Sequence, residues 1–153
     1  MKPRAVLGVA LTFTALAASV ARAQGDRWER EVRTQLGRAA ESLQSLNQGV
    51  ARTSVATRIG MLNTAESDSL VLPLHAQTSY VFVAACDEDC SSLSLSLSDL
   101  KSHELAVDRA TDHAAAVRLT PVTTASYRVR VVMETCHKNP CRYGLAVLTP
   151  PAP

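Results

Sequence analysis

The sequence has almost no surplus of charge of either sign. Its 153 residues include 16 Lys and Arg and 14 Asp and Glu. The first 23 residues contain three of the basic residues (Lys2, Arg4 and Arg22) and no acid, so the rest of the chain has 13 basic and 14 acidic residues. Proteins that bind nucleic acid use a basic surplus to neutralise phosphates. We therefore expect no nucleic acid among the partners.

Recognisable catalytic motifs are also missing. The sequence contains no G-x-S-x-G nucleophile motif, no C-x-x-C redox pair and no D-x-D-x-D-G calcium loop. No nucleophile has a base beside it in a recognisable pattern. These absences predict a protein that is not an enzyme, with a metal-assisted enzyme as the less favoured alternative.

Only one long apolar run occurs, at the N-terminus. A basic start, Met1 to Arg4, precedes the apolar stretch Ala5 to Val20, and Ala21-Arg22-Ala23 then provides a small-x-small cleavage pattern. The apolar stretch is shorter than the roughly 20 residues that span a bilayer core. We expect residues 1–23 to be a cleaved signal peptide, with an uncleaved anchor as the alternative. The protein is then secreted or periplasmic and has no stable membrane span.

Residues 24–50 have helical periodicity. Apolar side chains recur three or four positions apart, at Trp28, Val32, Leu36, Ala39, Leu43, Leu46 and Val50. This spacing predicts an amphipathic α-helix whose apolar face packs on the rest of the domain. The same spacing fits three heptads, so a homo-oligomer formed through a coiled coil is an alternative. A helix lying on a membrane surface is a third interpretation.

Residues 51–149 instead alternate with a period of two. Turn residues separate eight candidate strands: Ser54–Leu62, Ser69–Leu74, Tyr80–Ala85, Ser92–Ser98, Glu104–Arg109, Ala115–Thr120, Ser126–Glu134 and Tyr143–Leu148. No helical pattern intervenes, which favours an antiparallel, jelly-roll-like β-sandwich of about eight strands over βαβ units. Residues 150–153 are expected to form a flexible Pro-rich tail.

Two of these segments indicate which side chains face the core. In one, Leu93, Leu95 and Leu97 alternate with serines. In the other, four apolar residues (Tyr127, Val129, Val131 and Met133) alternate with polar positions that include Arg128 and Arg130. We expect the apolar residues to point inward and the serines and arginines to point outward.

The four cysteines form two close pairs, Cys86-x3-Cys90 and Cys136-x4-Cys141. An even number of cysteines in an exported chain favours disulfides, and four cysteines allow three pairings. Both pairs lie in stretches rich in turn residues, which favours the local pairings Cys86–Cys90 and Cys136–Cys141. A four-thiolate zinc site is the alternative. The intervening acids, Asp87-Glu88-Asp89, raise calcium as a further possibility, although no cofactor is expected.

The order of the strands resembles the bacterial pre-peptidase C-terminal domain, a secreted β-sandwich module. The resemblance rests on "DSLVLPL", "YVFVAAC", "SLSLSLSD", "AVRLTP", "SYRVRV" and "YGLAVL", between about residues 60 and 147. It implies a free-standing, non-catalytic copy of a module that aids export, stability or attachment. Acids of the family's D-L-D-L strand can accompany calcium binding, and Ser92, Ser94 and Ser96 occupy those positions in this sequence.

The expected function is binding to a protein or glycan outside the cytoplasm. If the last two strands are neighbours, one polar contact patch is formed by Arg128, Arg130, Arg142 and Tyr143. The principal alternative is a structural protein that oligomerises through the N-terminal helix.

Overall fold

The computed structural model describes residues 27–42, 53–109 and 111–150. Residues 27–42 are helical, and eight strands follow: β1 (Thr53–Leu62), β2 (Ser67–Leu74), β3 (Tyr80–Cys86), β4 (Cys90–Asp99), β5 (Glu104–Arg109), β6 (Ala114–Leu119), β7 (Ala125–Cys136) and β8 (Cys141–Thr149). The ends of all eight predicted strands agree with these bounds to within two residues. The predicted signal peptide, residues 1–23, lies outside the described residues.

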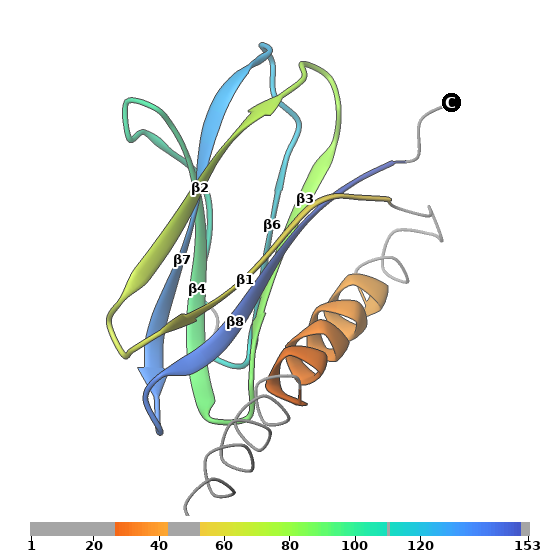
Figure 1. The fold of residues 1–153 in the computed structure, drawn as a ribbon. Coiled ribbons are helices and arrows are strands. Elements are labelled where there is room, and N and C mark those ends of the chain that lie inside the picture. The colour runs from red at the N-terminus through yellow and green to blue at the C-terminus, as the bar shows by residue number, and fades with distance from the viewer. Residues whose placement is uncertain (1–26, 43–52, 110, 151–153) are drawn as a thin grey trace, which may run out of the picture.

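The strands form two antiparallel four-stranded sheets, which confirms the predicted β-sandwich. The strand order is β1-β8-β3-β6 in the first sheet and β2-β7-β4-β5 in the second. Figure 1 shows the sheets as two layers, with the helix beside the sheet that contains β3 and β8. Consecutive strands β7 and β8 belong to different sheets, so the chain crosses from one layer to the other between them.

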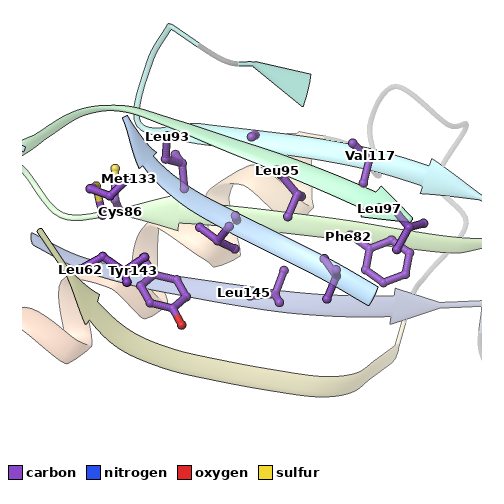
Figure 2. Close-up of a cluster of buried hydrophobic side chains, with 14 of the residues drawn as sticks. Leu62, Phe82, Cys86, Leu93, Leu95, Leu97, Val117, Met133, Tyr143 and Leu145 are labelled. Carbon is purple, nitrogen blue, oxygen red and sulfur yellow. The ribbon is translucent and has the colours of Figure 1, made fainter. Parts of the chain in front are cut away.

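The alternating segments form the core between the sheets. Leu93, Leu95 and Leu97 of β4 are completely buried, as are Val129 and Met133 of β7. Figure 2 shows the β4 leucines and Met133 gathered with Phe82 and Tyr143 from the opposite sheet. The period of two places one face of each strand in the core, which explains why this pattern predicted the orientation correctly.

Strand β3 is buried on both faces. All seven of its residues, Tyr80–Cys86, are buried. Phe82 and Ala84 join the core between the sheets, whereas Val81, Val83 and Ala85 belong to a second apolar cluster on the outer face of the sheet. A strand covered on both sides is apolar at successive positions rather than at alternate ones, which accounts for the run "YVFVAAC".

The helix covers this outer face. Val32 and Leu36 are buried in the second cluster, and Ala39 packs against it. Close approach requires Gly144 of β8, because a Cβ atom there would lie 2.5 Å from Leu36 Cδ1 and 2.7 Å from Val32 Cγ1. The prediction that the helix packs on its own domain is therefore confirmed over residues 27–42.

This packing bears on the alternatives for the helix. Val32 and Leu36 are occupied within the domain and are not free to form a coiled coil, so the structure lends no support to a homo-oligomer through this face. Leu43, Leu46 and Val50 lie outside the described residues. Within residues 27–42, 53–109 and 111–150, no helix has the length and apolar character needed to cross a membrane.

Candidate binding cleft

Two disulfide loops lie together at one end of the sandwich. The bonds join Cys86 to Cys90 and Cys136 to Cys141, which confirms the predicted local pairing. Cys90 and Cys136 are opposite each other in the β4–β7 ladder, so the two loops are neighbours. The backbone N–H of His137 in one loop donates to the carbonyl oxygen of Asp89 in the other at 2.8 Å. No cysteine is free, so none is available as a zinc ligand.

A cleft of about 300 Å³ opens between these loops, the helix and the end of β1. Its apolar lining comes from three separate segments: Trp28 of the helix, Met61 of β1 and Pro140 of the second loop. Its polar lining comes from the loops and the start of β8, and consists of Asp87, Asp89, Lys138, Asn139 and Arg142. Apolar walls with a few converging polar groups are typical of ligand sites.

Asp87 is the most unusual group in the cleft. Its side chain is only 3% exposed. Carboxylate oxygen Oδ2 accepts the backbone N–H of Arg142 at 2.8 Å, whereas Oδ1 is buried and has no hydrogen-bond partner among the described residues. Burial raises the pKa of Asp87 above its ordinary value, and the nearby charge of Asp89 acts in the same direction. Hydrogen bonds from the backbone N–H groups of Arg142 and Asp89, and the charge of Arg142, lower the pKa but only in part. Buried carboxylate oxygens are normally hydrogen-bonded, so this one requires an explanation.

One acid of the helix, Glu31, lies near the first disulfide loop. Glu31 has a raised pKa, first because it is partly buried and then because Glu88 and Asp87 carry like charges nearby. Arg27 partly offsets these charges: its guanidinium lies 3.8 Å from Glu88 Oε1, and its Cζ atom is 5.4 Å from the centroid of the Trp28 ring. One exposed ion pair therefore links the helix to the first disulfide loop, whereas the apolar packing of the helix is against β3 and β8.

The acids of the first loop do not all face the same surroundings. Asp87 is buried, whereas Glu88 is exposed and faces Arg27. In the part of the chain that the structure describes, no three side chains of His, Cys, Asp and Glu are grouped so that they could hold a metal ion. The expectation of no cofactor, with calcium as the alternative, stays an untested prediction.

The predicted patch of Arg128, Arg130, Arg142 and Tyr143 is not one surface. Arg128 and Arg130 lie on β7, in the sheet opposite the one that contains Arg142 and Tyr143. Tyr143 is 1% exposed and belongs to the core. The prediction of one patch is wrong because it treated the last two strands as a hairpin, whereas the chain changes sheet at the second disulfide loop. Of the four residues, Arg142 alone lines the cleft.

Tyr143 instead forms a polar link between the two sheets. Its hydroxyl donates to Asp68 Oδ2 of β2, and Arg58 Nε of β1 donates to the same oxygen at 2.6 Å. Partial burial alone would raise the pKa of Asp68, but the hydrogen bonds from Tyr143 and Arg58 lower it below its ordinary value. Burial and the neighbouring Asp68 raise the pKa of Tyr143 to about 12. A Cβ atom at Gly60 would lie 2.7 Å from Tyr143 Cε1, so Gly60 makes room for the ring.

Arg128 and Arg130 belong to a separate polar face on the second sheet. Arg130 is exposed, and its Nη2 donates to Ser67 Oγ at 2.9 Å. Ser94 donates to Glu134 Oε1 at 2.6 Å on the neighbouring strands. This face lies on the other sheet and contributes no lining residue to the cleft, so it provides a matched control surface.

Sequence reasoning missed the cleft as a unit. It identified Asp87 and Asp89 as part of an acidic loop and assigned Trp28 to the contact between helix and domain, but nothing in the spacing brings these residues to Met61 or Asn139. One signal in the sequence indicated a contact surface at this place. Trp28 lies at the polar start of the amphipathic helix, and a tryptophan side chain combines a large apolar ring with a polar N–H group.

Comparisons with known proteins show similarity in fold alone. No family model matches the sequence, and no curated protein matches it. Structural similarity extends to the pre-peptidase C-terminal domain of a collagenase from Bacillus anthracis, which is 13% identical over 60% of this chain and 87% of that chain, with a TM-score of 0.45.

Two other structures have a similar arrangement. A periplasmic inhibitor of g-type lysozyme from Aeromonas hydrophila is 10% identical over 67% of this chain and 89% of that chain, with a TM-score of 0.48. A carbohydrate-binding module of a Cellvibrio mixtus lichenase, in complex with cellotriose, is 7% identical over 68% of this chain and 98% of that chain, with a TM-score of 0.36. At these values the likeness extends to the general β-sandwich arrangement and no further.

Proposed function

We propose that the protein is an exported, non-catalytic binding module whose ligand site is the cleft between the helix and the two disulfide loops. The observation that carries this proposal is the buried carboxylate of Asp87, a lining residue of a cleft with apolar walls, whose Oδ1 atom has no hydrogen-bond partner among the described residues. An acceptor buried without a partner lowers stability, and such groups are retained where a ligand or a special chemistry uses them. The two disulfides favour a location outside the cytoplasm, as export requires.

The architecture around the cleft supports a preorganised site. The disulfides restrict both loops, and the hydrogen bond from His137 to Asp89 joins one loop to the other. Trp28 is carried by a helix whose Val32 and Leu36 are fixed in an apolar cluster. Because little ordering of side chains is then left for the binding step, a cleft of this kind binds with a small entropic cost.

The resemblance in sequence to pre-peptidase C-terminal domains supports the type of module proposed. The segments that carry this resemblance form β2, β3, β4, β6, β7 and β8. The ligand is then a protein or glycan of the cell envelope or the extracellular medium, and the module binds it without altering it.

A retention experiment with matched variants tests this proposal. Full-length protein exported to a periplasm is immobilised and incubated with solubilised envelope and with culture medium from its source. We expect a defined ligand to be retained by the wild type and by the control Arg128→Ser/Arg130→Ser. Its retention should be lost in Trp28→Ala and Met61→Ser, which alter two walls of the cleft while leaving the core between the sheets unchanged.

Two results would contradict the proposal. Equal retention by the wild type and by both cleft variants, with their folding verified by thermal unfolding, would place binding elsewhere. Recovery of the ligand in a chemically altered form would show that the protein is an enzyme.

A further inference from the structure

We propose that the cleft binds a protonated amine or guanidinium group on a short apolar stem, as presented by a Lys or Arg side chain of a partner protein. Asp87 and Asp89 accept the N–H donors of this group, and Trp28 and Met61 contact its stem. This inference rests on the proposed function, because it names the ligand chemistry of the same cleft.

Oδ1 of Asp87 is buried and has no partner among the described residues, so a ligand reaches it only if the atoms that cover it move aside. The charge of the carboxylate then determines the kind of group that fits. An ionised carboxylate accepts hydrogen bonds and donates none, so a partner for Oδ1 must be a donor. The backbone N–H of Arg142 already serves Oδ2. Charge-assisted bonds from an ammonium or guanidinium group to a carboxylate are stronger than bonds from a neutral hydroxyl. A cationic donor therefore gains more from this position than a neutral one.

The charges around the cleft also favour a cation. The lining residues balance in charge, with Asp87 and Asp89 against Lys138 and Arg142. Outside the lining, the acid Glu31 lies close enough to Asp87 and Glu88 for their charges to interact, and Arg27 lies beside Glu88. Arg27 is already paired with Glu88 at 3.8 Å, and Arg142 offsets part of the charge of Asp87. The like-charge repulsion that acts on Glu31 and Asp87 is relieved when a further positive charge enters. An anion would increase that repulsion.

The size and walls of the cleft suit a single basic side chain. A volume of about 300 Å³ is at the lower end of the range found for small-molecule sites. Trp28, Met61 and Pro140 provide apolar contact for methylene groups, as long basic side chains pack their stems on apolar surface while the charged end is solvated or paired. The Arg27 guanidinium already lies over the Trp28 ring, 5.4 Å from its centroid, and an aromatic ring attracts a cation placed over its face.

Three small probes distinguish the chemistry and its source. Nα-acetyl-lysine amide carries the cation on its natural stem. Its Nε-acetylated form keeps the stem and removes the charge. Free 1,5-diaminopentane represents a soluble amine. Binding of each probe to the full-length exported protein is followed by backbone amide NMR, using the signals of Asp87, Cys90 and Arg142.

We expect Nα-acetyl-lysine amide to shift these signals and its Nε-acetylated form to bind about tenfold or more weakly. The Asp87→Asn variant should weaken binding of the charged probe by a similar factor. This variant retains a side-chain oxygen for the N–H of Arg142, so the loop contact is preserved. Asp89→Asn provides a second test at a less buried position, and Arg128→Ser/Arg130→Ser should bind as the wild type does. If the free diamine binds as tightly as Nα-acetyl-lysine amide, the result would support a cationic ligand and would indicate that this ligand is a soluble amine rather than a side chain of a partner protein.

The inference is overturned if the charged and neutral probes bind equally, or if both Asp87→Asn and Asp89→Asn bind the charged probe as tightly as the wild type. If no probe binds while Trp28 and Met61 remain necessary for retention of an envelope ligand, the ligand class is wrong and the proposed function stands. If neither experiment detects binding, both proposals fall.

Discussion

Two hydrogen bonds join Asp87 to Arg142, and both residues line the cleft. The backbone N–H of Arg142 donates to Asp87 Oδ2 at 2.8 Å, and the backbone N–H of Asp87 donates to the carbonyl oxygen of Arg142 at 3.1 Å. This reciprocal contact joins the first disulfide loop to the start of β8. It also fixes the orientation of the carboxylate, so that Oδ1 is left without a partner among the described residues.

The raised pKa of Asp87 predicts a specific dependence of stability on pH. A carboxyl whose folded-state pKa exceeds its ordinary value of 3.8 binds its proton more tightly when folded. Its effect on stability therefore becomes more favourable as the pH falls from neutrality through the folded-state pKa towards 3.8. Denaturant unfolding of the wild type and Asp87→Asn from neutral to mildly acidic pH isolates this effect, because the other acids are common to both. The wild type should gain stability relative to the variant as the pH falls; a gap that stays constant or changes in the opposite direction would contradict the assignment.

The link between Tyr143 and Asp68 predicts an alkaline transition. The phenol has an ordinary pKa of 10.0 and a folded-state pKa of about 12, so the folded protein holds this proton more tightly. Stability is present in full below pH 10.0 and is lost as the pH rises towards about 12. The tyrosinate absorbance of the wild type should contain a component with a pKa of about 12 that Tyr143→Phe lacks.

At neutral pH, Tyr143→Phe should lower the free energy of unfolding by about 1.5–3 kcal/mol, the range for a bond to a charged group. Identical titrations of the two proteins would show that Tyr143 is not the group concerned.

The helix contact depends on the absence of a side chain at position 144. Gly144→Ala places a Cβ atom 2.5 Å from Leu36 Cδ1, so either the helix or β8 must move. We expect the free energy of unfolding to fall by about 1–3 kcal/mol, as found for overpacked cores. Gly37→Ala is the matched control, since a Cβ atom there meets nothing within 4 Å and alanine favours a helix. It should stabilise the protein by up to about 1 kcal/mol. Chemical denaturation measures both, and equal stability of Gly144→Ala and the wild type would contradict this packing.

The second disulfide should matter more for binding than for folding. It closes a short loop, with a sequence separation of 5 residues between Cys136 and Cys141, so its removal should cost about 2 kcal/mol. Because the loop carries three residues of the cleft (Lys138, Asn139 and Pro140), the variant Cys136→Ser/Cys141→Ser should remain folded and lose retention of the envelope ligand. Thermal unfolding and the retention experiment together check this expectation. A folded variant with wild-type retention would show that the loop does not form part of the site.

Local sequence patterns predicted most of the fold because the spacing of apolar residues along one helix or strand shows which of its faces is buried. The alternation around Leu93 to Leu97 and the helical spacing of Val32 and Leu36 each report which face of one element is covered. The two short disulfides were likewise predicted from the turn-rich stretches in which the two pairs of cysteines lie. By contrast, the sheet to which β8 belongs depends on a crossover between layers, which no local pattern encodes. The burial of Tyr143 and the role of Gly144 follow from that crossover and were missed with it.

The cleft could not be predicted for a related reason. It combines Trp28, Met61, Asp87 and Arg142, which are far apart in sequence and meet only when the helix, β1 and both loops are assembled. The acidic loop attracted a calcium hypothesis because its residues are adjacent in sequence, yet Asp87 and Glu88 face different surroundings. Adjacency in sequence is a poor guide to convergence when successive side chains of a loop point in different directions.

The most direct test of the binding cleft is the pKa of Asp87 with and without a cationic ligand. Carboxyl-carbon NMR of the full-length protein follows the Asp87 signal through an acid titration, first alone and then with saturating Nα-acetyl-lysine amide. A cation that binds the ionised carboxylate must lower its pKa, because binding and ionisation are linked. The account predicts that the probe moves the raised pKa of Asp87 down towards its ordinary value of 3.8. A pKa that the probe leaves unchanged would show that Asp87 does not contact the cation, and it would contradict the proposed cationic ligand.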